Sequence, residues 1–216
     1  MRRSPLGYVY DFAVDLPTVL TFTLDTNCII AVDENRSEAK AVLELASAHR
    51  SGLASVGVVA ISASERQRDG VDLENFEEFK QRRSRLGLGE LDLLEPMSYF
   101  DITFWDFGLL CDDTMEALER EIHQILFPNF PFLWGDYCEK LGLIPATTKP
   151  DKKWRNAKCD VQAFWSHSFR KRDVFVTSGR RDSHAKTKKQ RLVSLAGSRI
   201  ETPESAAKLL RHAPCK

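Results

Sequence analysis

The sequence predicts an α/β protein with a central, mostly parallel sheet. Residues 19–24 alternate leucine or phenylalanine with threonine, a period of two that predicts a strand. Residues 38–49 carry alanine, valine and leucine at helical spacing, with Ser37 as the expected N-cap. Residues 53–61 form a valine-rich apolar run, typical of a strand buried on both faces. A strand, a helix and a strand with short joints predict a right-handed βαβ unit and therefore a parallel sheet.

The remaining elements are less regular at first and clearer toward the end. A charged stretch at about 65–92 is expected to contain a helix. Near 113–126 four apolar residues recur along one stripe, which predicts a helix that packs into the core. Between 93 and 150, prolines and dense aromatic residues interrupt any periodic pattern. The last predicted elements are a helix at about 157–170, a strand at 174–177, a helix at about 185–196, a short strand near 199–200 and a helix that starts after Thr202-Pro203.

Length and composition predict one domain. A chain of 216 residues is long enough to bury a core. We expect a single domain over 1–216, with a helical, aromatic-rich insertion at about 71–150. No apolar run approaches the roughly 18 residues that span a bilayer, so the expected location is cytoplasmic, with no membrane partner. The five cysteines are far apart without a C-x-x-C pair, which favours reduced thiols over a disulfide framework or a zinc site.

Three acidic residues lie beside the predicted strands. Asp25 ends the first strand, Glu65 follows the second, and Asp160 is placed in the first turn of the helix before the strand at 174–177. Ligands of open parallel sheets bind outside the carboxyl ends of the strands, so these side chains are expected to share one site. Carboxylate oxygens suit Mg²⁺ or Mn²⁺. Such an ion lowers the pKa of water and holds a phosphodiester for attack.

Each acid also has an ordinary structural explanation. Asp25 fits a turn cap, and Ser62 with Glu65 fits the S-x-x-E capping box at a helix start. Asp160, near a predicted helix N-terminus, would be favoured there by the helix dipole. Their joint placement at three strand ends or adjoining helix starts is what favours a shared site.

These segments resemble the motifs of PIN-domain nucleases. The run Phe22-Thr-Leu-Asp25-Thr26-Asn27 looks like their opening motif, a hydrophobic strand that ends in Asp-Thr/Ser-Asn. Val59-Ala-Ile-Ser-Ala-Ser-Glu65 resembles their second motif, and Asp160 with the strand that ends in Thr177-Ser178 resembles the third and fourth. The resemblance covers about 19–70 and 155–210, and it leaves the middle of the chain unassigned.

The resemblance implies a three-layer α/β/α fold and a metal-dependent endoribonuclease that hydrolyses RNA. Asp25, Glu65 and Asp160 would be catalytic metal ligands, and Asn27 and Thr177 would hold them by hydrogen bonds. Many members of the family carry an aspartate two residues after the threonine. Here that place is Gly179, and Asp182 stands three residues later as the candidate fourth ligand.

A basic tract follows the last acidic motif. Between Arg170 and Arg191 lie nine lysines or arginines against two aspartates, the footprint of a phosphate-backbone partner or a solvated helix face. The candidate RNA-contacting residues are Arg180, Arg181, Lys188 and Lys189. The expected substrate is single-stranded RNA. The family is similar to prokaryotic toxin ribonucleases and to RNA-processing endonucleases. The further partners expected are an antitoxin-like protein and a second copy of this chain.

Other functions fit the sequence less well. An aspartate-nucleophile phosphatase needs a second aspartate two residues after the first, where this chain has Asn27. No G-x-x-x-x-G-K-[ST] or G-x-G-x-x-G loop is present. His167, on about the same helix face as Asp160, is expected to be a hydrogen-bonded histidine rather than a catalytic base. The alternative that stays open is a catalytically degenerate PIN-like module that binds RNA or protein, which Gly179 supports.

Overall fold

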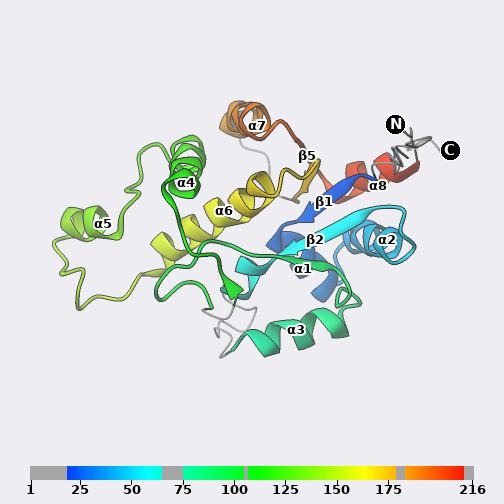
Figure 1. Ribbon diagram of the computed structural model, residues 1–216, viewed down its shortest axis with the longest axis horizontal. Coiled ribbons are helices and arrows are strands. Elements are labelled where there is room, and N and C mark those ends of the chain that lie inside the picture. The colour runs from blue at the N-terminus through cyan, green and yellow to red at the C-terminus, as the bar shows by residue number, and fades with distance from the viewer. Residues whose placement is uncertain (1–18, 65–74, 105–106, 179–182, 212–216) are drawn as a thin grey trace, which may run out of the picture.

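Five parallel strands form the centre of the protein (Figure 1). The computed structural model describes residues 19–64, 75–104, 107–178 and 183–211. For residues 183–185 it describes the backbone alone. Within them the strand order is β3-β2-β1-β4-β5, and every neighbouring pair is parallel. The strands are β1 (Thr21–Leu24), β2 (Ser55–Val59), β3 (Asp92–Leu94), β4 (Val174–Val176) and β5 (Arg199–Glu201). The predicted α/β class with a parallel sheet is confirmed.

Two hydrophobic cores lie on the two faces of this sheet. One core joins Phe22, Leu24, Val56 and Val58 to a first group of helices, and the other joins Val59, Phe175 and Ile200 to a second group. The first group comprises α1 (Thr26–Asp33), α2 (Ala39–Arg50), α3 (Phe76–Arg85) and α8 (Pro203–Arg211). The second comprises α4 (Asp113–Leu126), α5 (Trp134–Leu141), α6 (Lys152–Phe169) and α7 (Ser183–Ala196). This arrangement is a three-layer α/β/α fold.

The central position of β1 follows from its sequence. Phe22 and Leu24 are buried in the first core, while Thr23 between them is buried on the opposite side of the strand. The Thr23 hydroxyl is 2.9 Å from Nδ1 of His167 on α6, so its polar atom has a partner inside the second layer. A strand that buries both faces suits the middle of a parallel sheet.

Several element boundaries differ from the sequence-based expectation. Helix α6 begins at Lys152, with the Asp151 side chain accepting a hydrogen bond from Trp154 N, so Asp160 lies in the middle of the helix. Helix α2 has Glu38 as its N-cap residue and no side-chain cap, so the N-cap role expected of Ser37 is wrong. The sequence patterns missed α1, β3 and α5. The helix expected after Thr202 is confirmed, and the Thr202 hydroxyl accepts from Ser205 N.

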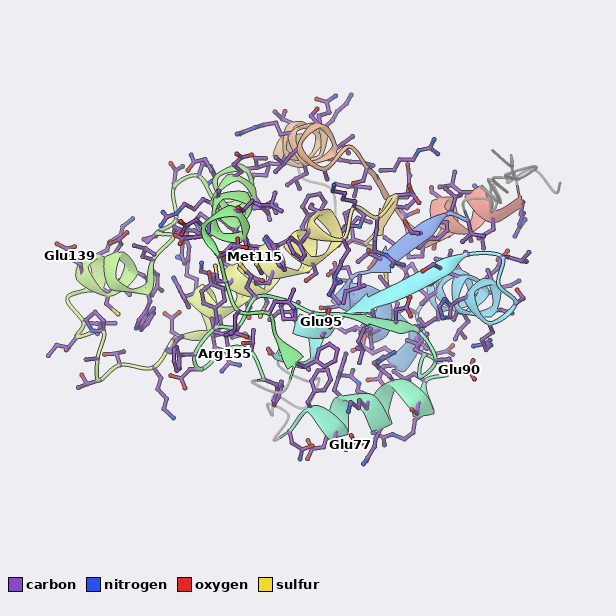
Figure 2. The ribbon with its side chains drawn as sticks, viewed as in Figure 1. Glu77, Glu90, Glu95, Met115, Glu139 and Arg155 are labelled. Atoms are coloured by element: carbon purple, nitrogen blue, oxygen red, sulfur yellow. The ribbon has the colours of Figure 1, made fainter. Side chains whose placement is uncertain are left out.

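The segment between β3 and α6 adds helices outside the βα units. Figure 1 shows α4 and α5 beyond α6, with α5 farthest from the strands. Helix α4 matches the predicted range 113–126, and Met115, Ile122 and Ile125 of its apolar stripe are buried in the second core. Met115, labelled in Figure 2, also binds α6 through its carbonyl, which accepts from Trp165 Nε1 at 3.1 Å. No helix in the described part of the chain is long and apolar enough to cross a membrane.

Candidate functional site

Asp25 and Thr177 meet at the carboxyl edge of the two central strands. Asp25 follows β1 and Thr177 follows β4, and Asp25 N donates to Val176 O at 3.0 Å. The Thr177 hydroxyl donates to Asp25 Oδ2 at 2.8 Å. Because β1 and β4 are parallel neighbours in register, residues 152 positions apart in the chain come into direct contact.

Asp25 is held by two further donors from its own motif. As the N-cap residue of α1, it accepts a 2.8 Å hydrogen bond from Thr26 N on Oδ1. Asn27 Nδ2 donates to Oδ2 at 3.1 Å. A carboxylate has about four lone-pair sites. Three donors in the described residues therefore fix the orientation of this side chain and leave Oδ1 able to accept one more partner.

Burial and hydrogen bonding act on the Asp25 carboxyl in opposite directions. Burial raises the pKa of Asp25, while the bonds from Thr177, Thr26 and Asn27 lower it, and burial has the larger effect. A carboxyl so placed is stabilised in its charged form by any cation that approaches the open lone pair.

Asp160 is the second carboxylate of the site. It lies on α6, and desolvation by the surrounding protein raises its pKa to about 7, with the negative charge of Asp25 as the second cause. Its side chain is nonetheless exposed on one side, so solvent or a ligand reaches it. Within the described residues Asp160 has no ion-pair partner. Two carboxylates that repel one another, with no cation of the described residues paired to Asp160, would be stabilised by a bound cation.

The end of β2 is tied to the same place through a short 3-10 helix, η1 (Ala60–Ser64). The Ser62 hydroxyl is 2.7 Å from the Thr26 hydroxyl, in a buried contact between η1 and α1. Arg155 of α6, labelled in Figure 2, donates through Nη2 to Ser64 O at 3.1 Å. Ser62 therefore contacts the first motif, and it lies inside η1 instead of at the helix start that a capping box needs.

Several predicted site residues fall outside the described residues. These are Glu65, Gly179, Arg180, Arg181 and Asp182. The described neighbour of Glu65, Ser64, is joined to α6 by Arg155.

Lys188 and Lys189, the two predicted RNA-contacting lysines on α7, are among the described residues. Lys189 is exposed. Lys188 donates to Leu126 O at the end of α4, at 2.6 Å. Their role in RNA binding stays a prediction.

His167 is a hydrogen-bonded core residue. It is fully buried, and its ring nitrogens lie 2.9 Å from Thr23 Oγ1 and 2.8 Å from Ser198 Oγ. Burial lowers the pKa of His167 to about 3, so the ring is neutral at physiological pH. With both nitrogens engaged, His167 links α6 to β1 and to the turn before β5, as the sequence interpretation favoured.

Sequence reasoning missed the residues that join the motifs to each other. Arg155 lies five positions before Asp160 and shows no motif of its own, since its partner is a backbone carbonyl 91 residues away. The Thr26–Ser62 contact was equally hidden. The one available signal was that both residues are small and hydroxylic, with Thr26 next to Asp25 and Ser62 three residues before Glu65.

The donor set fits a hard divalent cation as far as it is described. Asp25 and Asp160 offer oxygen ligands of the kind that Mg²⁺ and Mn²⁺ prefer. Among the described residues no group of three or more His, Cys, Asp or Glu side chains is arranged to hold a metal ion. The two acids are thus the described part of the candidate site.

No protein-family model, curated protein or solved structure matches the chain. The resemblance to PIN-domain nucleases therefore rests on the motifs, and the architecture rests on the structure.

Proposed function

We propose that this protein is a metal-dependent endoribonuclease of the PIN-domain type, which hydrolyses phosphodiester bonds of single-stranded RNA. The observation that carries the proposal is the pair Asp25 and Asp160 at the carboxyl edge of the sheet. Burial raises the pKa of Asp160 and the charge of Asp25 raises it further, while three donors orient Asp25 and leave Oδ1 a lone pair that no described residue fills. Two neighbouring carboxylates repel one another unless a cation compensates their charge.

Mg²⁺ or Mn²⁺ would be held by Asp25 and Asp160, with Glu65 and Asp182 proposed as further ligands. When bound, the ion supplies Lewis-acid activation of water and neutralises charge on the phosphodiester. The chain itself orients the first carboxylate through Thr177, Asn27 and Thr26 N. Arg155 and the Thr26–Ser62 contact fix the segment that leads to Glu65 relative to both acids.

The deciding experiment is an assay of purified protein on end-labelled single-stranded RNA. Cleavage is expected with Mn²⁺ or Mg²⁺ and is expected to stop in EDTA. Asp25→Asn, purified in the same way, controls for contaminating ribonuclease and should lose the activity, because it removes the charge while conserving shape. Asp136→Asn, on the exposed side of α5, makes the same chemical change away from the site and should cleave normally.

The same assay separates the enzyme from the degenerate binding module. RNA binding without cleavage, under every metal condition, would support the module. Equal cleavage by wild type and Asp25→Asn would remove Asp25 from the reaction and overturn the proposal.

A further inference from the structure

A cavity lies on the other side of α6 from the acidic pair. Its volume is about 670 Å³, within the usual range for small-molecule sites. The walls come from residues 98–101, 132–134 and 145–150, from Cys111 and Glu116, and from Trp154 and Lys158 of α6. Lys158 and Asp160 are two residues apart, about 200° around the helix, so the cavity and the acidic pair use opposite faces of α6.

Aromatic side chains dominate the walls of this cavity. Its lining includes five aromatic rings, those of Tyr99, Phe100, Phe132, Trp134 and Trp154. Trp134 and Trp154 meet edge to face, with ring centroids 5.2 Å apart. The Phe100 ring is 78% exposed. Rings that surround an open volume in this way offer flat surfaces on which a planar ligand can stack.

The charges in the wall argue against an ionic ligand. The Lys158 ammonium lies 3.9 Å from the Phe132 ring centroid and 4.8 Å from that of Tyr99, so the aromatic cage already holds a cation. That ammonium is also paired with Glu119 at 2.9 Å. The remaining charged residues of the lining are one cation, Lys149, and two anions, Asp101 and Glu116, so they add no excess of positive charge. The cavity therefore favours a neutral ligand.

One hydrogen-bond donor in the wall lacks an acceptor. Trp154 is 4% exposed, and its indole N–H is buried with no hydrogen-bond partner among the described residues. Leaving such a donor unsatisfied is unfavourable, so a carbonyl oxygen would bind well there once the wall shifts enough to uncover the nitrogen. By contrast, the indole N–H of Trp134 donates to Pro145 O at 3.4 Å.

We propose that this cavity binds a neutral heteroaromatic ring that carries a carbonyl, of the nucleobase class, stacked on the aromatic wall and accepting from Trp154 Nε1. Two sources share this chemistry, a free nucleoside and an unstacked base of a single-stranded RNA. The site is separate from the acidic pair, and the proposal does not depend on cleavage.

The test is calorimetric titration of the full chain in EDTA with uridine and guanosine. Saturable binding is expected for both nucleosides and not for ribose, which lacks the base. Trp154→Phe keeps an aromatic ring and removes the donor, so the affinity should fall about tenfold. Trp134→Phe is the matched control in the same wall and should change the affinity by about twofold or less, since its N–H already has an acceptor.

Ala146→Trp tests the same cavity without changing Trp154. Ala146 is exposed and lines the cavity, so the larger side chain should fill it and abolish binding. This test holds even if Trp154→Phe is unstable. A short oligouridylate tells the two sources apart. Tighter binding than uridine, lost in Ala146→Trp, assigns the site to a base of RNA, and binding of the nucleoside alone assigns it to a free ligand. The proposal is overturned by no saturable binding in the wild type, by equal binding of ribose, or by unchanged affinity in folded Trp154→Phe.

Discussion

Two carboxylates at opposite faces of helix α6 differ in how their charge is compensated. Glu119 of α4 is fully buried, pairs with Lys158 at 2.9 Å and accepts from Gln162 Nε2 at 3.0 Å, while the Tyr99 hydroxyl donates to its other oxygen. Asp160 is exposed on one side and has no ion-pair partner among the described residues. Its influential neighbour is another acid, Asp25.

The difference indicates what each carboxylate is for. A buried charge whose partners all come from the chain is complete when the protein is folded, so Glu119 holds α4 and residue 99 against α6. Two neighbouring acids without such compensation are destabilising unless something external compensates them. The candidate site is therefore recognised by the carboxylates that the described residues leave without a cation there.

The largest effect on stability is expected from removing the cation of the buried Lys158–Glu119 ion pair. Lys158→Met leaves Glu119 buried without its cation, which should lower the free energy of unfolding by about 3–5 kcal/mol. Urea denaturation measures this change, with Lys152→Met on an exposed position of the same helix as the control. The folded fraction should bind Mn²⁺ with unchanged affinity. A loss below about 1 kcal/mol would mean that this pair is not the structural link we describe.

Asp160→Asn is expected to act on metal binding. Even residues that only support a metal ligand change its affinity about 10–100-fold, so loss of a ligand should weaken Mn²⁺ binding by about 100-fold or more. Calorimetric titration of wild type and variant gives the ratio, and Asp136→Asn serves as the matched control. If Asp160→Asn binds Mn²⁺ like the wild type, the acidic pair is not a metal site.

A smaller effect is expected at Thr177. Thr177→Val removes the hydroxyl that donates to Asp25 Oδ2 and keeps the shape, so Mn²⁺ affinity and RNA cleavage should each fall about tenfold. Thr177→Ser keeps the hydroxyl and should recover most of both. Equal values for the valine and serine variants would show that the hydrogen bond does not support the site.

The sequence predicted the parts of the fold that repeat a simple period. The strand at 19–24, the valine-rich strand that follows and the stripe of α4 are present. Helix α1 was missed because Asp25-Thr26-Asn27 looks like a turn, whereas the Asp25 side chain caps a helix that starts at Thr26. The start of α6 was placed too late because Asp151, its real cap, follows Pro150 in an irregular stretch.

The candidate site was predictable in outline and not in its supporting contacts. The topological rule that strand ends share one edge was enough to bring Asp25 and Thr177 together. The contacts of Arg155 with Ser64 O and of Ser62 with Thr26 depend on how helices pack, which a single sequence does not encode by any local pattern. The aromatic cavity was hidden for the same reason, because its walls come from five separate stretches of the chain.

The smallest predicted effect is a gain of stability in Asp160→Asn, the variant that is expected to bind Mn²⁺ more weakly. The pKa of Asp160 is about 7 in the folded protein, against an ordinary value of 3.8. As pH rises from about 4 to 7, the unfolded chain loses this proton first, so the folded state binds more protons and its stability falls. Asp160→Asn has no proton to lose and escapes this penalty. Since the side chain is partly exposed, solvent screening reduces the benefit to on the order of 1 kcal/mol, or about 2–4 °C in Tm.

Thermal melting in EDTA should therefore show Asp160→Asn above the wild type at pH 8 and equal to it near pH 4, with Asp136→Asn unchanged at both. Saturating Mn²⁺ should reverse the order at pH 8, because the ion stabilises the protein that binds it. A wild type as stable as the variant at pH 8 without metal would mean that Asp160 is already compensated within the chain. The contrast with Glu119 would then disappear, and with it the strongest argument for a cation at this edge of the sheet.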